Sequence, residues 1–226
     1  MDNIEYHFHH ADGSSDSIIV STNTRHEIVV PDEFQPPDWT LLANQQCSNC
    51  TLSPEEKRYC PIARNIAYLF SGIPERDSYE PVIMEVVRNE VTCSANTTMQ
   101  RALSSLLGLI CALSPCPRSI FLKPMGVFHL PLSTELDALS RTFSFFMMKQ
   151  YFEKLENNCV LHINVDDLVQ NYRNLRIMNR GIANRVRNIH GTDAPVNAIV
   201  LLDLLAHYID CEIEDQLNEL REVFAA

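Results

Sequence analysis

Four of the eight cysteines are spaced like the ligands of a metal site. Cys47, Cys50 and Cys60 form a C-x2-C-x9-C run, and Cys116 follows much later between two prolines. Thiolates suit zinc and iron because soft sulfur donates charge to a borderline metal, and two thiolates three residues apart converge from one tight turn. The flanking prolines hold Cys116 in a rigid, non-helical corner. The sequence therefore predicts one four-cysteine site, with Cys116 as the fourth ligand.

His129 is the reserve ligand, because a neutral imidazole also binds metal. It lies in an apolar segment, where a lone histidine is more often a core residue whose hydrogen bonds are satisfied. The other four cysteines are isolated along the chain and are predicted to be small buried hydrophobic residues. These are Cys93, Cys111, Cys159 and Cys211.

Zinc is the leading cofactor, since four thiolates around zinc are the common outcome for a C-x2-C pair in a reducing compartment. An iron–sulfur cluster is the alternative, because proline follows Cys60 and Cys116 directly, as it does at the end of ferredoxin-type runs. The compact cysteine run of a ferredoxin is missing. A third possibility has no metal, with Cys47 and Cys50 acting as a redox dithiol.

A second chemical pattern is a run of arginines late in the chain. Five arginines and no carboxylate lie between Leu168 and His190, and helical periodicity brings Arg173, Arg176, Arg180 and Arg187 near one face. Guanidinium groups bind phosphate and carboxylate, so an anionic small molecule or an acidic partner could bind there. Pairing with the acidic residues after position 211 is the simpler explanation.

Composition excludes several classes of protein. The chain has 226 residues, 46% of them hydrophobic, and a net charge of −11, which disfavours generic binding to nucleic acid or anionic membranes. The longest apolar run is Leu106–Leu113, and the acidic N-terminus lacks the apolar segment of a secretory signal, so we expect a cytoplasmic protein with reduced cysteines. The absence of G-x-S-x-G, H-E-x-x-H and glycine-rich phosphate loops argues against common hydrolases, kinases and dehydrogenases.

These features must be positioned by a single α+β domain spanning residues 1–226 that is mainly helical. Residues 1–38 are predicted to form an antiparallel β-meander, with strands at Tyr6–His10, Ser17–Ser21 and His26–Val30. Residues 39–72 form the cysteine knuckle and a helix that begins at Pro61. Residues 81–226 form one strand, at Pro81–Val91, and a helical bundle.

One of the predicted helices is apolar on two sides. Two stripes follow Thr134 at helical spacing: Leu136, Leu139, Phe143, Met147 and Tyr151, and beside them Phe145, Met148 and Phe152. Such a helix lies in the core or at an oligomer interface, and we expect the core, because aromatic stripes at this spacing are usually packing residues.

The order of several short motifs looks like that of a family of uncharacterised bacterial cytosolic proteins. The motifs are W-T, C-S-N-C, Y-C-P-I-A-R-N, S-S-L-L-G, S-P-C-P, K-P-M, F-H-L-P-L and V-N-A-I-V, beginning at Trp39, Cys47, Tyr59, Ser104, Ser114, Lys123, Phe128 and Val196. The resemblance covers nearly the whole chain and implies the same four cysteine positions. It brings no established activity.

The function that these observations favour is non-enzymatic. We expect a metal-binding sensory or adaptor protein whose metal is structural or reports redox state, and whose helical face engages a protein partner or a second copy. An iron–sulfur protein in electron transfer or redox catalysis is the alternative. A small-anion or nucleotide binder that uses the arginine-rich helix is the third possibility.

Overall fold

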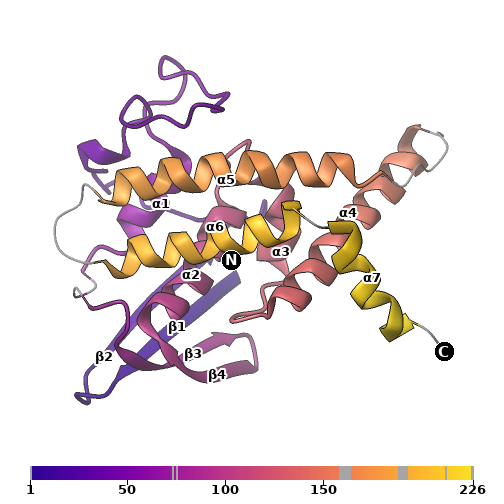
Figure 1. The fold of residues 1–226 in the computed structure, drawn as a ribbon. Helices are drawn as coiled ribbons and strands as arrows, with labels where there is room; N and C mark the ends of the chain where they lie inside the picture. Colours follow the sequence, from indigo (N-terminus) through magenta and orange to yellow (C-terminus); the bar gives the residue numbers. More distant parts are fainter. Residues whose placement is uncertain are drawn as a thin grey trace.

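The computed structural model describes residues 2–72, 74, 76–157, 164–187, 193–211 and 213–224. Within these residues a four-stranded antiparallel sheet is combined with seven α-helices, most of which follow the sheet in sequence. The fold is therefore α+β and mainly helical, as predicted. Figure 1 shows the sheet on one side of the molecule and the long C-terminal helices on the other.

The sheet has the strand order β2-β1-β3-β4. Its strands are β1 (Asp2–His10), β2 (Ser15–Thr22), β3 (Pro81–Arg88) and β4 (Val91–Thr98). Alternation along β1 buries Ile4, Tyr6 and Phe8 on the inner face, and Tyr6 pairs with Ile18 of β2 and Val86 of β3. The β1–β2 turn uses Gly13 at φ 84°, a conformation that glycine adopts without steric cost.

Two predictions for the sheet were wrong. Residues 26–30 form a single bridge, between Thr22 and Ile28, and not a third strand of the meander. The predicted strand at Pro81–Val91 is β3, but it ends at Arg88, and a turn at Asn89 leads into β4. The sequence did not indicate β4 because this polar edge strand has no buried residue, and therefore shows no apolar alternation.

The structure confirms the predicted helix start at Pro61 and the predicted helix after Thr134. The helices are α1 (Pro61–Leu69), α2 (Met99–Leu113), α3 (Lys123–Val127), α4 (Glu135–Asn157), α5 (Asp166–Arg187), α6 (Ala194–Cys211) and α7 (Ile213–Phe224). Pro61 occupies the first turn of α1, where a missing N–H costs nothing. At the start of α4 the Thr134 hydroxyl accepts a hydrogen bond from the backbone N–H of Asp137 at 3.1 Å.

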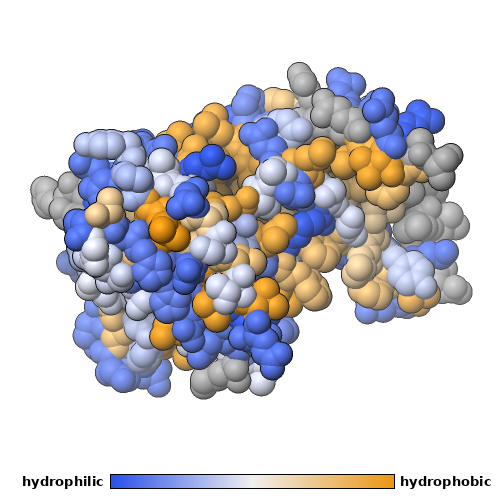
Figure 2. All heavy atoms as spheres, turned by 90° about the horizontal axis from the view of Figure 1, so that it is seen from below, coloured by the Kyte–Doolittle hydropathy of each residue, from blue (hydrophilic) through white to orange (hydrophobic). Residues whose placement is uncertain are grey.

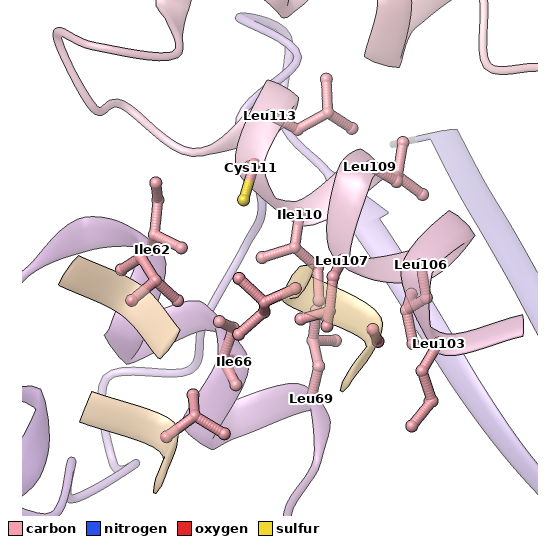
Figure 3. Close-up of a cluster of buried hydrophobic side chains, with 14 of the residues drawn as sticks. Ile62, Ile66, Leu69, Leu103, Leu106, Leu107, Leu109, Ile110, Cys111 and Leu113 are labelled. Atoms are coloured by element: carbon pink, nitrogen blue, oxygen red, sulfur yellow. The ribbon is translucent and has the colours of Figure 1, made fainter. Parts of the chain in front are cut away.

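Helix α2 is the centre of the fold. It contacts the sheet through β3 and β4 on one side and α6 on the other, and α5 packs along α6 (Figure 1). Figure 3 shows α1 packed beside α2, with Ile62, Ile66 and Leu69 directed toward Leu107 and Ile110. Every element that supplies a predicted metal ligand therefore lies against this core.

Helix α4 departs from the prediction that it lies in the core. Only Ala138, Leu139 and Thr142 are buried, whereas Phe152 is 53% exposed and Leu155 is 60% exposed. The helix runs away from the core toward α7 (Figure 1), and Figure 2 shows apolar side chains at the surface of the molecule. The second half of the apolar stripe is thus a surface feature.

Helix α6 is long and apolar enough, by length and composition alone, to cross a membrane. In this structure it packs between α2 and α5. These contacts bury 33% of the helix, and Val200 and Leu204 remain 42% and 56% exposed.

Candidate four-cysteine metal centre

The four predicted ligands line one small cavity. Cys47 and Cys50 come from the loop before α1, Cys60 immediately precedes α1, and Cys116 follows α2. The space between them is about 10 Å³, close to that of a single water-sized sphere. Apolar side chains complete the wall, from Leu42, Leu52, Ile62, Met178 and Ile182.

The loop that carries Cys47 and Cys50 is closed by backbone hydrogen bonds at its base. Leu42 N–H donates to the carbonyl of Arg58, and Cys60 N–H donates to the carbonyl of Thr40, both at 2.8 Å. A tight turn then brings the first two cysteines together, because Cys50 N–H donates to the Cys47 carbonyl at 2.9 Å. The C-x2-C spacing thus forms a local knuckle, as expected.

Asn49 fixes this knuckle to the rest of the protein. Its side-chain amide donates to the carbonyl of Asn174 on α5 at 3.0 Å. The backbone carbonyl of Asn49 accepts a hydrogen bond at 2.5 Å from Nε of Arg118, which lies two residues after Cys116. The loop, α5 and the segment after α2 are therefore joined at the cysteine cavity.

Cys60 and Cys116 are both buried, and burial is the main reason that the pKa of each thiol is raised. The backbone N–H of Ala63 in the first turn of α1 opposes this effect at Cys60 by stabilising the thiolate. The N–H of Arg118 does the same at Cys116. Cys60 and Cys116 thus each have a nearby backbone N–H that would stabilise a thiolate.

Cys47 lies closest to α5. Its pKa is raised to about 12, chiefly by burial and then by the proximity of Cys60, Cys116 and Cys50. A methyl group on Gly181 would stand 2.5 Å from the Cys47 sulfur. Glycine at this position of α5 therefore leaves the room that Cys47 occupies.

A buried guanidinium lies beside the four thiols. Arg185 is 1% exposed and lines the same cavity. Its Nη atoms donate to the carbonyls of Trp39, Leu41 and Leu42 at 2.7–3.1 Å, and its Nε has no hydrogen-bond partner in the part of the chain that the structure describes. Among the described residues it forms no ion pair with a carboxylate. Arg185 favours the thiolate forms of Cys47 and Cys60 through its charge.

The sulfurs are brought together but are not drawn in to ligating distance. In the described part of the chain, His207, Asp210 and Cys211 form a group whose ligand atoms all lie within 4.8 Å of one another, and the four cysteines are not gathered so tightly. Four sulfurs bonded to zinc at about 2.3 Å would lie closer than this. Four thiols at one cavity, beside a buried guanidinium, are a donor set that fits a metal, and binding would bring the sulfurs closer together.

The exposed His207 group is less suited to a cation. Arg176 of α5 donates to Asp210 at 3.0 Å, which places a positive charge on the only carboxylate of the group. The Cys211 sulfur lies 3.0 Å from Nδ1 of His207. His207, Asp210 and Cys211 lie close together because residues three and four apart share one face of a helix, here in the last turns of α6.

The structure places His129 in a different cavity from the four cysteines. Its Nε2 lies 2.5 Å from the Tyr6 hydroxyl, which is also 3.2 Å from the hydroxyl of Ser105. Burial, followed by the charges of Arg141 and Arg88, lowers the pKa of His129 to about 3. His129 thus has the satisfied, neutral character of a core histidine.

The four arginines predicted for anion binding differ in their partners within the described residues. Arg176 pairs with Asp210 and Asp203 of α6. Arg187 donates to Asn184, while Arg173 and Arg180 are exposed. The fifth arginine, Arg185, turns inward instead. Its position could have been read from the sequence, because Met178, Ile182 and Arg185 follow the i, i+4, i+7 spacing of a buried helix face.

The remaining cysteines differ from one another. Cys111 is buried, as predicted, and lies near enough to Cys116, Cys60 and Cys47 for their charges to raise its pKa further, although burial is the larger cause. Cys93 is half-buried and Cys211 is exposed, so the prediction of burial was wrong for Cys211. Cys159 lies outside the described residues. The described cysteines form no disulfide.

Comparison with family models gives one match, over residues 4–225, to the family described as Domain of unknown function (DUF6901). The match spans nearly the whole chain, so the protein belongs to this uncharacterised family. Searches against curated proteins and against solved structures give no match.

Proposed function

We propose that this protein is a non-enzymatic metal-binding protein that holds one metal ion, with zinc as the leading candidate, between Cys47, Cys50, Cys60 and Cys116. The observation that carries the proposal is the meeting of four thiols and a buried, carboxylate-free guanidinium at a single cavity. The cysteines come from three separate places in the sequence, so chance proximity along the chain does not explain their meeting.

The position of Arg185 argues for negative charge at this cavity. Removing a guanidinium from water is costly, and buried charges in proteins are normally paired. Arg185 has neutral carbonyls as its hydrogen-bond acceptors. A divalent ion held by four thiolates carries net negative charge, which would compensate the arginine. Neutral thiols would leave it uncompensated.

The size of the space favours a single ion over a cluster. About 10 Å³ is open between the cysteines, and large side chains such as Met178, Ile182 and Leu42 surround it. An iron–sulfur cluster, with several metal and sulfide atoms, would require this wall to move apart. One zinc ion with its four sulfurs takes up less space than a cluster. The cytoplasm, which keeps thiols reduced, is the compartment that suits such a site.

The proposed role of the metal is primarily structural, and sensing or adaptor activity would depend on the structure that the metal stabilises. A metal at this point would join the 41–59 loop, α1, the corner after α2 and α5. Cys47 and Cys50 are only half-buried, so an oxidant can reach them and release the metal. The exposed apolar half of α4 supports the adaptor role, because exposed apolar patches commonly mark contact surfaces for partners or second copies.

Metal analysis of protein purified without oxygen tests the proposal directly. We expect one equivalent of zinc, no visible colour, and loss of most of the metal in a Cys116→Ser variant. Cys93→Ser and Cys211→Ser are matched controls and should retain it. A brown protein that contains iron and sulfide would show that the site holds an iron–sulfur cluster and not zinc. A metal-free wild type would contradict the proposal.

A further inference from the structure

A second cavity, much larger than the one at the cysteines, lies within the helical layer. Its volume is about 510 Å³, within the range of small-molecule sites. Helices α2, α3, α4, α5 and α6 all contribute to its wall. Leu130 and Leu204 line it and are 42% and 56% exposed, so the cavity opens to the surface. Protein interiors are normally packed without voids of this size.

The wall of this cavity is predominantly apolar. Leucines from α2, α5 and α6 form much of it, including Leu109, Leu175, Leu202 and Leu205. An apolar wall in contact with water is unfavourable by about 25 cal/mol per Å² of exposed area. An apolar ligand body in the cavity would remove that surface from water.

The charged groups around the cavity are unbalanced. Arg101 of α2 and Arg141 of α4 line it, against one carboxylate, Glu135. Arg101 forms no ion pair within the described residues. Asp137, which also attracts Arg141, already accepts hydrogen bonds from Thr134. Among the charged residues that line the cavity itself there are therefore two cations and one anion, in a chain whose net charge is −11.

Neutral polar groups lie beside these arginines. Ser104 and Ser105 line the cavity from α2, and His129 lines it from the loop after α3. Ser105 and His129 are joined through the hydroxyl of Tyr6. The polar part of the wall can therefore orient a head group while the leucines hold an apolar body.

We propose that this cavity binds a small amphipathic carboxylic acid of the fatty-acid type, with its chain among the leucines and its carboxylate at Arg101 and Arg141. Guanidinium groups suit a carboxylate because they donate two parallel hydrogen bonds to its oxygens. This ligand site is separate from the proposed metal centre. Cys111 lines the cavity and also lies near three of the four cysteines, so a single turn of α2 stands between the two sites.

Isothermal titration with decanoate, below its micelle concentration, tests the site. Decylammonium has the same chain with the opposite charge, and butyrate has the same head group with little chain. We expect decanoate to bind at least about tenfold more tightly than decylammonium, because only the carboxylate forms charged hydrogen bonds with the arginines. We expect the same margin over butyrate, because the longer chain buries more apolar surface.

Variants locate the binding. Ser104→Phe should fill the cavity and abolish binding, and Arg141→Gln and Arg101→Gln should each weaken binding of decanoate but not of decylammonium. Arg25→Gln changes an exposed arginine away from the cavity and should have no effect. Metal content and thermal midpoint, measured in parallel, show whether each variant is folded, and they separate this result from the test of the cysteine site.

Four outcomes would overturn the proposal. These are no heat with decanoate, equal affinity for decanoate and decylammonium, unchanged decanoate binding by the arginine variants, and unchanged binding by a folded Ser104→Phe variant. Light scattering adds another: a dimer that dissociates when Ser104 is replaced by Phe would show that the occupant is a second copy of the chain.

Discussion

Arg185 is the residue that most clearly links sequence to chemistry in this protein. Its side chain lies on the buried face of α5, although its charge would ordinarily place it at the surface. Three backbone carbonyls of the 39–42 segment accept its hydrogen bonds, and the four thiols line the same cavity. With a metal bound as proposed, the residue would have two separable roles, hydrogen bonding to the loop and charge compensation.

Two substitutions of Arg185 separate these roles. Lysine keeps the charge but loses the planar set of donors, whereas glutamine keeps an amide donor and loses the charge. If charge compensation dominates, Arg185→Lys should retain metal more tightly than Arg185→Gln, with the latter weakened by about 10–100-fold, the range found for residues that support metal ligands. Competition with a chromophoric chelator measures both. Equal affinities for the two variants would show that the charge is unimportant.

His129 makes the stability of the fold depend on pH. Its pKa is about 3 in the folded protein because it is buried, against 6.5 when exposed, so the unfolded chain binds a proton more readily. The stabilisation is complete above about pH 6.5 and is lost as the pH falls from there toward 3, at no more than about 1.4 kcal/mol per pH unit.

Urea titrations between pH 7 and pH 5 test this effect. The free energy of unfolding should fall with pH in the wild type, and a His129→Gln variant should show a smaller fall because it cannot titrate. A His26→Asn variant, which replaces an exposed histidine, should keep the wild-type slope. An unchanged slope in His129→Gln would contradict the assignment.

At the scale of elements, α5 has to remain helical and also leave room for the sulfur of Cys47. Glycine in a helix interior costs about 1 kcal/mol relative to alanine, so Gly181 is unfavourable for α5 considered alone. It is explained by the Cys47 sulfur, which occupies the place of the missing side chain. The local propensity is therefore outweighed by a contact between segments that are far apart in the sequence.

Replacing a glycine in a helix by alanine usually raises the stability of the protein, but Gly181→Ala should lower it. In metal-loaded protein we expect a loss of stability, because a bound Cys47 cannot rotate away from the added methyl group, and small-to-large changes in tight sites cost about 1–3 kcal/mol. In a Cys47→Ala background the same substitution should stabilise α5 by up to about 1 kcal/mol. Urea unfolding of the four proteins gives the coupling. Additive effects would mean that Cys47 and Gly181 do not constrain each other.

At the scale of the whole molecule, the cysteine cavity is the place where the loop, α1, α2 and α5 meet. The loop itself has few buried residues, and most of its positions from 43 to 58 are exposed or half-buried. Such a segment is ordered mainly by its anchors. A metal at the cavity would therefore stabilise the folded chain as a whole, since the unfolded chain has no assembled site.

Removing the metal with a chelator should lower the thermal midpoint of the wild type by about 10 °C or more. A change of 1 kcal/mol shifts the midpoint by about 2–4 °C in a protein of this size, and structural zinc sites contribute several kcal/mol. The 41–59 loop should also become the first site of cleavage by a protease. Cys116→Ser should resemble the chelated wild type and show no further change with chelator. If the chelator changes neither the thermal midpoint nor the cleavage pattern of the wild type, the metal has no structural role.

The sequence by itself determined the α+β class, the four candidate cysteines and the starts of α1 and α4. The cysteine spacing, the proline at the start of α1 and the Thr134 cap are local properties that act over a few residues. The tertiary structure decided the polar edge strand β4, the inward turn of Arg185, the exposed half of α4 and the separation of His129 from the cysteines. These depend on which distant segments pack together, and packing is a property of the whole chain that no short window of sequence contains.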